Sequence, residues 1–363
     1  MRRLTALLAL AATTCFAQAP PDDESGYAGA RPMMAEQQKL VAPNAIEVSE
    51  AVTLGGLKQW ITIRGADKAN PVLIYVHGGP GAAEMGRSWP YQRGLEDYFT
   101  VVQWDQRGTG KTLRYGGEDA NKAGLTRQRM ADDLVELIGL VRQRVGAERV
   151  VLLGHSWGNV IGLDAALRKP GWISAYIGLG PLMGMRANEV ALYAAVQAEA
   201  RKRNDTAALA ELQAIAPYPG DGDLSFDKVN VTRKWVMAYG GLAAYRPDAD
   251  FYFRAARLSP DYELEDRLAV SRGGQLSVPA LLPDLLRVDH TRIKAVSFPV
   301  FMFLGRHDLT TPSSVIEPWL KQLKAPVKKI VWFEHSAHLA PHEEPGKFLV
   351  NLVEQVRPLA VRR

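Results

Sequence analysis

Short apolar runs alternate with helix-like stretches along most of this chain, and that alternation restricts the fold more than any other feature. Each run is short and continuous, which is typical of a strand buried on both faces of a sheet. Helical spacing follows in residues 126–145 and 159–169, after Pro312, and from about 344 to 356. The pattern predicts an α/β fold with a mostly parallel sheet and helices on both faces. The runs are PVLIYVHGG (71–79), FTVVQWDQRG (99–108), RVVLLGHS (149–156), WISAYIGLG (172–180), VSFPVFMFLG (296–305) and KKIVWFEHS (328–336).

Two stretches depart from this alternation. Residues 45–65 alternate around a Gly-Gly pair, which predicts a β-hairpin, and residues 20–43 are expected to form a loose polar leader. Residues 181–292 have helical spacing and Pro/Gly/Asp breaks but no sheet pattern, so we expect a helical cap inserted after the sixth strand. Residues 20–180 and 293–363 would then be the two parts of one core.

Residues 1–19 have the features of a secretory signal peptide. Arg2 and Arg3 precede a short apolar run, and Ala17-Gln18-Ala19 resembles a cleavage site. Removing them lowers the formal charge from +5 to +3 and takes away Cys15, the single cysteine. We therefore expect an exported protein, periplasmic or secreted, with no disulfide, no later membrane span and no basic surface for nucleic acid.

The segment GHSWG contains a serine on a predicted strand-to-helix corner. It fits the G-x-S-x-G pattern, in which the glycines leave room for a sharp turn that exposes the hydroxyl of Ser156. A serine hydroxyl needs a base to remove its proton and an acid to orient that base. Asp308 and His338 each follow a late strand and stand in the order Ser, Asp, His that this kind of fold uses. We predict these three residues as a catalytic triad.

The segment HGGPG (77–81) offers backbone donors near the same edge of the sheet. Preorganised N–H groups aimed at a developing oxyanion contribute ~3 kcal/mol each. One donor is expected to be the N–H of Trp157, directly after the serine, and the other to come from Gly79. The sequence therefore predicts an oxyanion hole made by these two residues.

Two other motifs resemble a nucleotide-binding loop and a metal site, and the sequence argues against both. GTGKT resembles the end of a phosphate-binding loop, but the required glycine is replaced by Asp105, so nucleotide binding is rejected. Asp105 and Arg107 are instead expected to form a charge pair beside the serine. His335, His338 and His342 resemble metal ligands, but Pro341 argues against one helix presenting all three, and we predict no metal and no cofactor.

The segments HGGPG, WDQRGTG, GHSWG, GRHD and SAHLAPHEEPGKF, in this order, resemble the α/β-hydrolase superfamily. More narrowly, they resemble the proline iminopeptidases and related tripeptidyl aminopeptidases. The resemblance covers about residues 45–180 and 296–350. It implies an α/β-hydrolase fold, Ser156, Asp308 and His338 as the triad, Gly79 and Trp157 as oxyanion donors, and a helical cap that selects the substrate.

The cap departs from that family. Proline iminopeptidases resemble one another in a W-x-x-W-E-G segment whose glutamate holds the free amino group, and here WVMAYGG places Tyr239 at that position. Tyrosine has no fixed negative charge at neutral pH, so Glu189, Asp248 or Asp250 are candidate replacements.

Three functions follow from these observations. The first is an exported serine hydrolase of the aminopeptidase type that acts on small peptides. The second is a carboxylesterase or lactonase with the same triad, and the third is a non-catalytic binding protein that kept the fold. The oligomeric state is not predicted.

Overall fold

One central sheet organises the protein, whose computed structural model describes residues 25–222 and 224–361. The predicted signal peptide at 1–19 lies outside these ranges. In the described residues the strands lie in the order β1-β2-β4-β3-β5-β6-β7-β8. Their bounds are β1 Ile46–Leu54, β2 Leu57–Gly65, β3 Val72–Val76, β4 Thr100–Trp104, β5 Val150–His155, β6 Ile173–Leu179, β7 Val300–Gly305 and β8 Lys328–Phe333.

The sheet is mostly parallel, as predicted. β1 and β2 form an antiparallel hairpin and β2 pairs antiparallel with β4, whereas every pairing from β4 through β3 to β8 is parallel. The carboxyl ends of the parallel strands therefore lie at one edge, where ligand sites of open α/β sheets are found.

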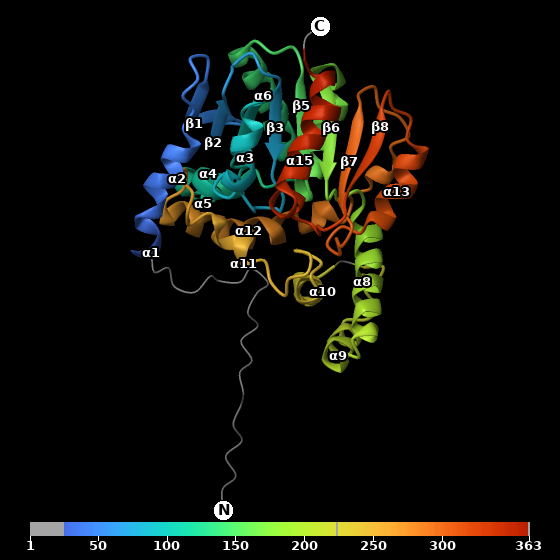
Figure 1. Cartoon of the computed structure of the whole chain (residues 1–363). Helices are drawn as coiled ribbons and strands as arrows, with labels where there is room; N and C mark the ends of the chain where they lie inside the picture. Colours follow the sequence, from blue (N-terminus) through green and yellow to red (C-terminus); the bar gives the residue numbers. More distant parts are fainter. Residues whose placement is uncertain (1–24, 223, 362–363) are drawn as a thin grey trace, which may run out of the picture.

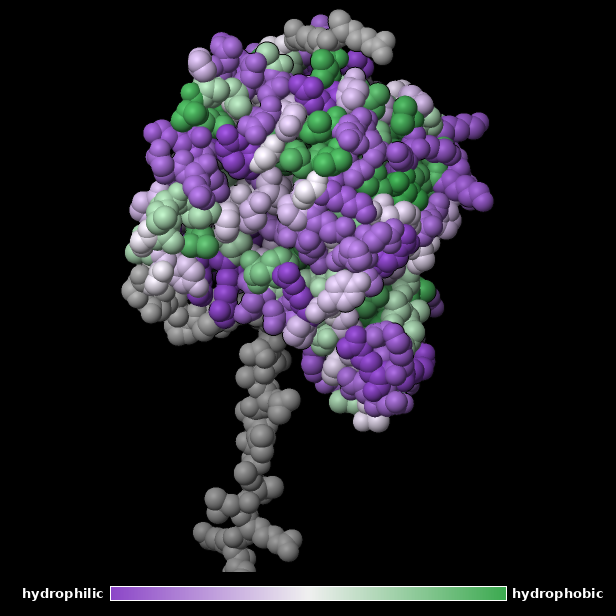
Figure 2. All heavy atoms as spheres, in the orientation of Figure 1, coloured by the Kyte–Doolittle hydropathy of each residue, from purple (hydrophilic) through white to green (hydrophobic). Residues whose placement is uncertain are grey.

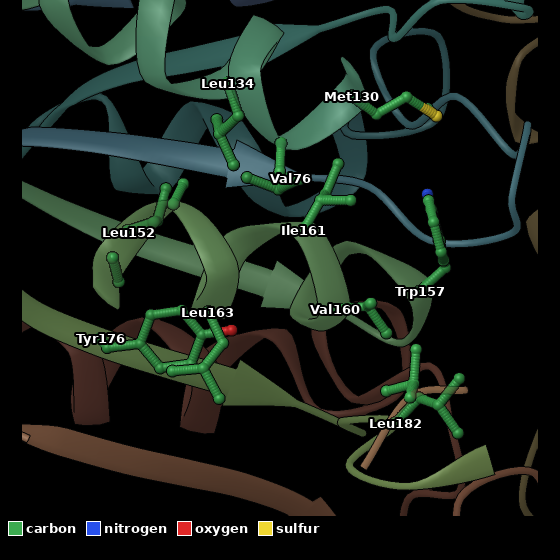
Figure 3. Close-up of a cluster of buried hydrophobic side chains, with 14 of the residues drawn as sticks. Val76, Met130, Leu134, Leu152, Trp157, Val160, Ile161, Leu163, Tyr176 and Leu182 are labelled. Carbon is green, nitrogen blue, oxygen red and sulfur yellow. The ribbon is translucent and has the colours of Figure 1, made fainter. Parts of the chain in front are cut away.

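Helices cover both faces of the sheet, because successive side chains of a buried strand point to opposite faces. In β5, Val150 and Leu152 pack with the helices on one face, and Val151 and Leu153 pack on the other. Figure 1 shows α3 and α15 in front of the sheet. Figure 3 shows the opposite face, where side chains of α6 and α7 pack against the strands. The covering helices are α3 Trp89–Leu95, α6 Arg127–Val145, α7 Trp157–Arg168, α13 Ser313–Gln322 and α15 Pro345–Asn351; further short helices are α4 Gly110–Gly116, α5 Glu118–Lys122 and α14 Ala340–Glu343.

Helices also fill the stretch between β6 and β7. They lie across the lower end of the sheet in Figure 1, and the α8–α9 pair projects from the molecule with a mainly hydrophilic surface (Figure 2). The division of the chain into a core and a cap at 181 and 292 stays a prediction. The helices are α8 Met185–Lys202, α9 Thr206–Ala214, α10 Phe226–Ala238, α11 Asp250–Ala255 and α12 Leu264–Leu285.

The expectation of a loose leader over 20–43 is wrong for residues 25–38. They form α1 Ser25–Ala28 and α2 Ala30–Gln38. No residue of α2 is buried, and polar contacts hold it: Arg31 Nε donates to the carbonyl of Arg257 at 2.8 Å, and Arg64 donates to the carbonyl of Gln38 at 2.5 Å. A helix without an apolar stripe lacks the periodic pattern from which a helix is predicted.

Among the residues that the structure describes, no helix combines the length and the apolar character needed to cross a bilayer.

Candidate active site

Ser156 stands on a strained corner between β5 and α7. Its backbone has φ +55° and ψ −116°, a region that a non-glycine residue rarely adopts. The flanking glycines permit this corner. A Cβ at Gly158 would lie 2.0 Å from the carbonyl oxygen of Val76, and one at Gly154 would lie 2.7 Å from the Cα of Asn159. The G-x-S-x-G pattern thus reflects close packing of backbone on both sides of the serine.

Asp308 and His338 form a buried pair that follows β7 and β8. His338 Nδ1 lies 2.8 Å from Asp308 Oδ2. A carboxylate only accepts, so Nδ1–H is the donor and Nε2 keeps a free lone pair. The amides of Thr310 and Thr311 both donate to Asp308 Oδ1 at 2.8 Å, and the Thr311 hydroxyl donates to Oδ2 at 2.9 Å. These bonds fix the orientation of the carboxylate and, through it, of the imidazole.

Ser156 and His338 open into one large cavity. Its volume is about 1290 Å³, and its wall also includes Gly79 and Trp157. Side chains of α10 and α12 complete the wall, so residues from the start, the middle and the end of the chain meet here. The structure therefore brings the serine, the Asp–His pair and both predicted oxyanion residues to one site.

A second histidine supports the imidazole. The rings of His155 and His338 lie 4.8 Å apart, and His155 Nε2 lies 3.0 Å from the carbonyl oxygen of His338. Burial, with a further contribution from His338, lowers the pKa of His155 to about 3, so this ring is neutral at pH 7 and its Nε2–H donates. Neither this role nor that of Thr311 was predicted from the sequence. The contact of His155 joins residues 183 positions apart, and no motif considered above includes Thr311.

The glycine loop is held by the segment that follows β4. Gly79 has φ +113°, and a Cβ there would lie 2.6 Å from the amide nitrogens of Gly81 and Ala82. The Thr109 hydroxyl donates to the carbonyl of Gly81 at 2.6 Å, and Gln106 Nε2 donates to the carbonyl of His77 at 2.8 Å. Trp157, as the first residue of α7, has an N–H without an intrahelical acceptor.

The expected charge pair between Asp105 and Arg107 does not form. Arg107 Nε donates instead to Asp133 of α6 at 3.1 Å, and Asp105 Oδ2 accepts from the Tyr262 hydroxyl at 2.5 Å. The strand ends at Trp104 and the chain turns at Arg107 and Gly108, so the two side chains reach different elements. Gln106 and Thr109, rather than the charged residues, hold the glycine loop.

None of the candidates for holding the amino group of the substrate lines the cavity; they are Tyr239, Glu189, Asp248 and Asp250. Tyr239 donates to Asp205 at 3.0 Å, and Asp250 is exposed and pairs with Arg254. Glu189 is fully buried in a bidentate pair with Arg233, at 2.6 and 2.9 Å. Helical spacing in the cap could not tell which face of each helix meets the core.

Glu189 is ionised, and the positive charge of Arg233 balances its negative charge. Burial opposes its ionisation, but the charge of Arg233 and hydrogen bonds from Arg233, Tyr218 and Asn188 hold the pKa of Glu189 below its ordinary value. The carboxylate of Glu189 therefore already has a cationic partner within the protein.

The two other histidines of the H-x2-H-x3-H pattern point elsewhere. His342 Nε2 bonds to Glu84 at 2.8 Å, and His335 is exposed. Over residues 25–222 and 224–361, no group of three or more histidine, cysteine or acidic side chains is arranged to hold a metal ion.

Known proteins resemble this chain in sequence and in fold. Residues 73–352 match the model of the Alpha/beta hydrolase family. The chain is 27% identical over 319 residues to the probable aminopeptidase YbaC of Bacillus subtilis, covering 86% of this chain and 97% of that protein. It is 27% identical over 304 residues to a proline iminopeptidase of Neisseria meningitidis, covering 79% and 88% of the two chains. The structure of a Mycobacterium smegmatis proline iminopeptidase is similar in fold, with a TM-score of 0.59 at 21% identity over 86% of this chain and 99% of that one.

Proposed function

Because the chain belongs to the α/β-hydrolase family, we propose that it is a serine hydrolase that cleaves a small acyl compound through an acyl-enzyme on Ser156. One observation carries this proposal: the serine on its strained corner and the imidazole of the buried Asp308–His338 pair line the same cavity. A binding protein has no need for this combination.

The mechanism follows from the hydrogen bonds. His338 Nε2 takes the proton of the Ser156 hydroxyl as the oxygen attacks the carbonyl carbon, and it then gives that proton to the leaving group. Asp308 holds Nδ1–H and stabilises the imidazolium that forms. Water, deprotonated by the same ring, then releases the acyl group from the serine. The backbone N–H groups of Gly79 and Trp157 are proposed to bind the oxyanion in both steps.

The substrate is the less determined part of the proposal. Relatives named as aminopeptidases and proline iminopeptidases favour an amide at the amino terminus of a small peptide. The cavity favours an ester or another acyl compound, because Glu265, an exposed residue of α12, is the one acidic side chain among the described residues that line it. A free amino group binds most strongly to a carboxylate removed from water. Glu189, which would be the natural choice, is already paired with Arg233.

A fluorophosphonate probe tests the nucleophile. We expect the wild-type protein to be labelled, Ser156→Ala to lose the label, and kcat to fall by at least about 10⁴-fold in that variant. Ser271→Ala is the matched control, since Ser271 lines the same cavity away from the corner and should keep its label. Labelling that survives in Ser156→Ala would contradict the proposal, and no labelling of the wild type would favour a non-catalytic binding protein.

Two substrate series separate the alternatives. Prolyl and alanyl p-nitroanilides report aminopeptidase activity, and short p-nitrophenyl esters report esterase activity. Anilide cleavage that depends on Ser156 supports the aminopeptidase, whereas ester turnover without anilide cleavage supports the carboxylesterase.

We also propose that the protein is exported. The charged start, apolar run and small-residue site in residues 1–19 support this proposal. Expression in a Gram-negative host should place the protein in the periplasm with Pro20 as its first residue. A cytoplasmic protein that retains residues 1–19 would contradict export.

A further inference from the structure

The wall of the cavity carries mainly positive charge. Its one acidic side chain among the described residues, Glu265, is exposed on α12. Against it stand five guanidinium groups, which would attract an anion into a mostly apolar cavity. The five are Arg87, Arg233, Arg257, Arg267 and Arg272.

Four of these five have an evident reason to be there without a ligand. Arg233 neutralises Glu189. Arg257 and Arg267 each interact with another group of the chain, and Arg272 is exposed to water. The fifth, Arg87, is buried and takes part in no ion pair within residues 25–222 and 224–361.

Arg87 is buried, and part of its hydrogen-bonding capacity is unused. It is only 7% exposed, its guanidinium carbon lies 4.6 Å from the centre of the Tyr252 ring, and its Nη1 is buried without a hydrogen-bond acceptor in the described part of the chain. A buried charged donor that bonds to nothing costs free energy, and native proteins rarely keep one without a use. Because Arg87 lines the cavity, an anionic ligand there can supply the missing acceptor.

The carboxylate of Glu84, three residues earlier in the chain, does not supply it. Glu84 is buried, and its oxygens accept from the Tyr91 hydroxyl at 3.0 Å, from the Tyr252 hydroxyl at 3.1 Å and from His342 Nε2 at 2.8 Å. No ion pair joins Glu84 to Arg87 in the described residues. The carboxylate of Glu84 thus serves to connect the glycine-loop segment to α11 and α14, and Arg87 keeps a donor for something else.

We propose that Arg87 binds a carboxylate of the substrate, so that the preferred substrate is a small acyl compound with a free carboxylate. This inference rests on the proposed serine hydrolase and specifies what that site accepts. A planar guanidinium forms short, charge-assisted hydrogen bonds to a carboxylate, and these are strongest in a cavity from which water is largely excluded. The carboxylate can belong to the acyl part, as in a half-ester of a dicarboxylic acid, or to the leaving group.

Matched ester pairs distinguish these two positions. Mono-p-nitrophenyl glutarate against p-nitrophenyl butyrate tests a carboxylate on the acyl part. 4-Butyryloxybenzoate against its methyl ester tests one on the leaving group. In the wild type we expect one charged ester to exceed its neutral partner in kcat/KM by about tenfold or more at physiological salt.

Variants of Arg87 test the residue. Arg87→Gln should lower that charged-to-neutral ratio by about tenfold, mainly through KM, and Arg87→Lys should give an intermediate value. Both esters of a pair are measured on the same preparation, so any loss of folded protein cancels in the ratio. Arg272→Gln is the matched control, because it removes the same charge from the exposed part of the wall and should keep the ratio within about twofold.

Two results would overturn this inference while leaving the proposed function in place. One is Ser156-dependent ester hydrolysis with no preference for either charged ester. The other is a preference that is equal in the wild type and in Arg87→Gln. If no ester or amide is hydrolysed in a Ser156-dependent way, the proposed function itself fails.

Discussion

Replacing Gly180 with alanine would place a methyl group against the Asp308–His338 pair. Gly180 follows β6 directly and has φ +45°. A Cβ there would lie 2.9 Å from His338 Nδ1 and 3.1 Å from Asp308 Oδ2. An ordinary contact begins near 3.4 Å, so the imidazole would have to move by about 0.5 Å. Since a misplacement of about 1 Å costs on the order of 10²-fold in rate, we expect kcat to fall by roughly tenfold.

The same substitution also strains the backbone. An alanine in the left-handed region costs about 1–2 kcal/mol, which lowers the melting temperature by a few degrees. Gly56, in the β1–β2 turn, is the matched control, because it has φ +75° and a Cβ there would meet nothing within 4 Å. Gly56→Ala should therefore lose a similar amount of stability and keep its kcat.

Ester hydrolysis and thermal unfolding, measured on both variants, separate strain from displacement. We expect comparable melting temperatures and a kcat that is about tenfold lower in Gly180→Ala alone. Equal kcat values in the two variants would refute it, because the Asp308–His338 pair would then not be the group that sets the rate.

Three further changes have defined outcomes. Asp308→Asn keeps the shape of the side chain but disturbs the imidazole tautomer, so kcat in ester hydrolysis should fall by about 10³–10⁴-fold with little change in melting temperature. Burial raises the pKa of Asp105 from 3.8 to about 7, although the Tyr262 hydroxyl opposes the shift. Because the pKa of Asp105 is higher in the folded than in the unfolded chain, its protonation stabilises the fold below about pH 4, and this stabilisation is lost as the pH rises to 7. In urea unfolding, the free energy of unfolding of Asp105→Asn should therefore increase relative to that of the wild type between pH 5 and 8. Arg107→Met removes a partner from buried Asp133 and should cost about 2–3 kcal/mol in urea unfolding, because Arg129 and Gln59 still bond to that carboxylate.

The core of the fold could be predicted from the sequence because a strand that is buried on both faces has a recognisable apolar sequence. All residues of β3, β4, β5, β6 and β7 are buried, so each strand is a mainly apolar run. Residues that follow such runs meet at one sheet edge, which is why Asp308 and His338 could be paired from their positions alone. The predicted hairpin and the helices after β5 and β7 are likewise confirmed.

The cap and the connections between segments could not be predicted in the same way. The helices of the cap were expected from spacing, but spacing does not determine which side faces the cavity, so Tyr239 and Asp250 were placed there incorrectly. The partner of Arg107 was predicted within its own loop, whereas the actual partner, Asp133, is 26 residues away on α6. None of the sequence motifs considered above contains Arg87. It stands out because it has a buried donor without an acceptor, a feature of the folded structure alone.

The order of the strands explains why a glycine must stand at position 180. In the sheet, β6 lies between β5, which ends at the serine corner, and β7, which leads to the acid. The amide of Ser156 donates to the carbonyl of Leu179 at 3.0 Å, and the amide of Gly180 donates to the carbonyl of Phe303 in β7 at 3.0 Å. The end of β6 is thus bonded on one side to the serine corner and on the other to the acid strand, and it fixes the separation of the two. Its next residue necessarily lies under the space that the Asp–His pair occupies, so a side chain there would compete with the pair for the same volume. A residue without a Cβ therefore stands where the chain leaves the sheet for the helices between β6 and β7.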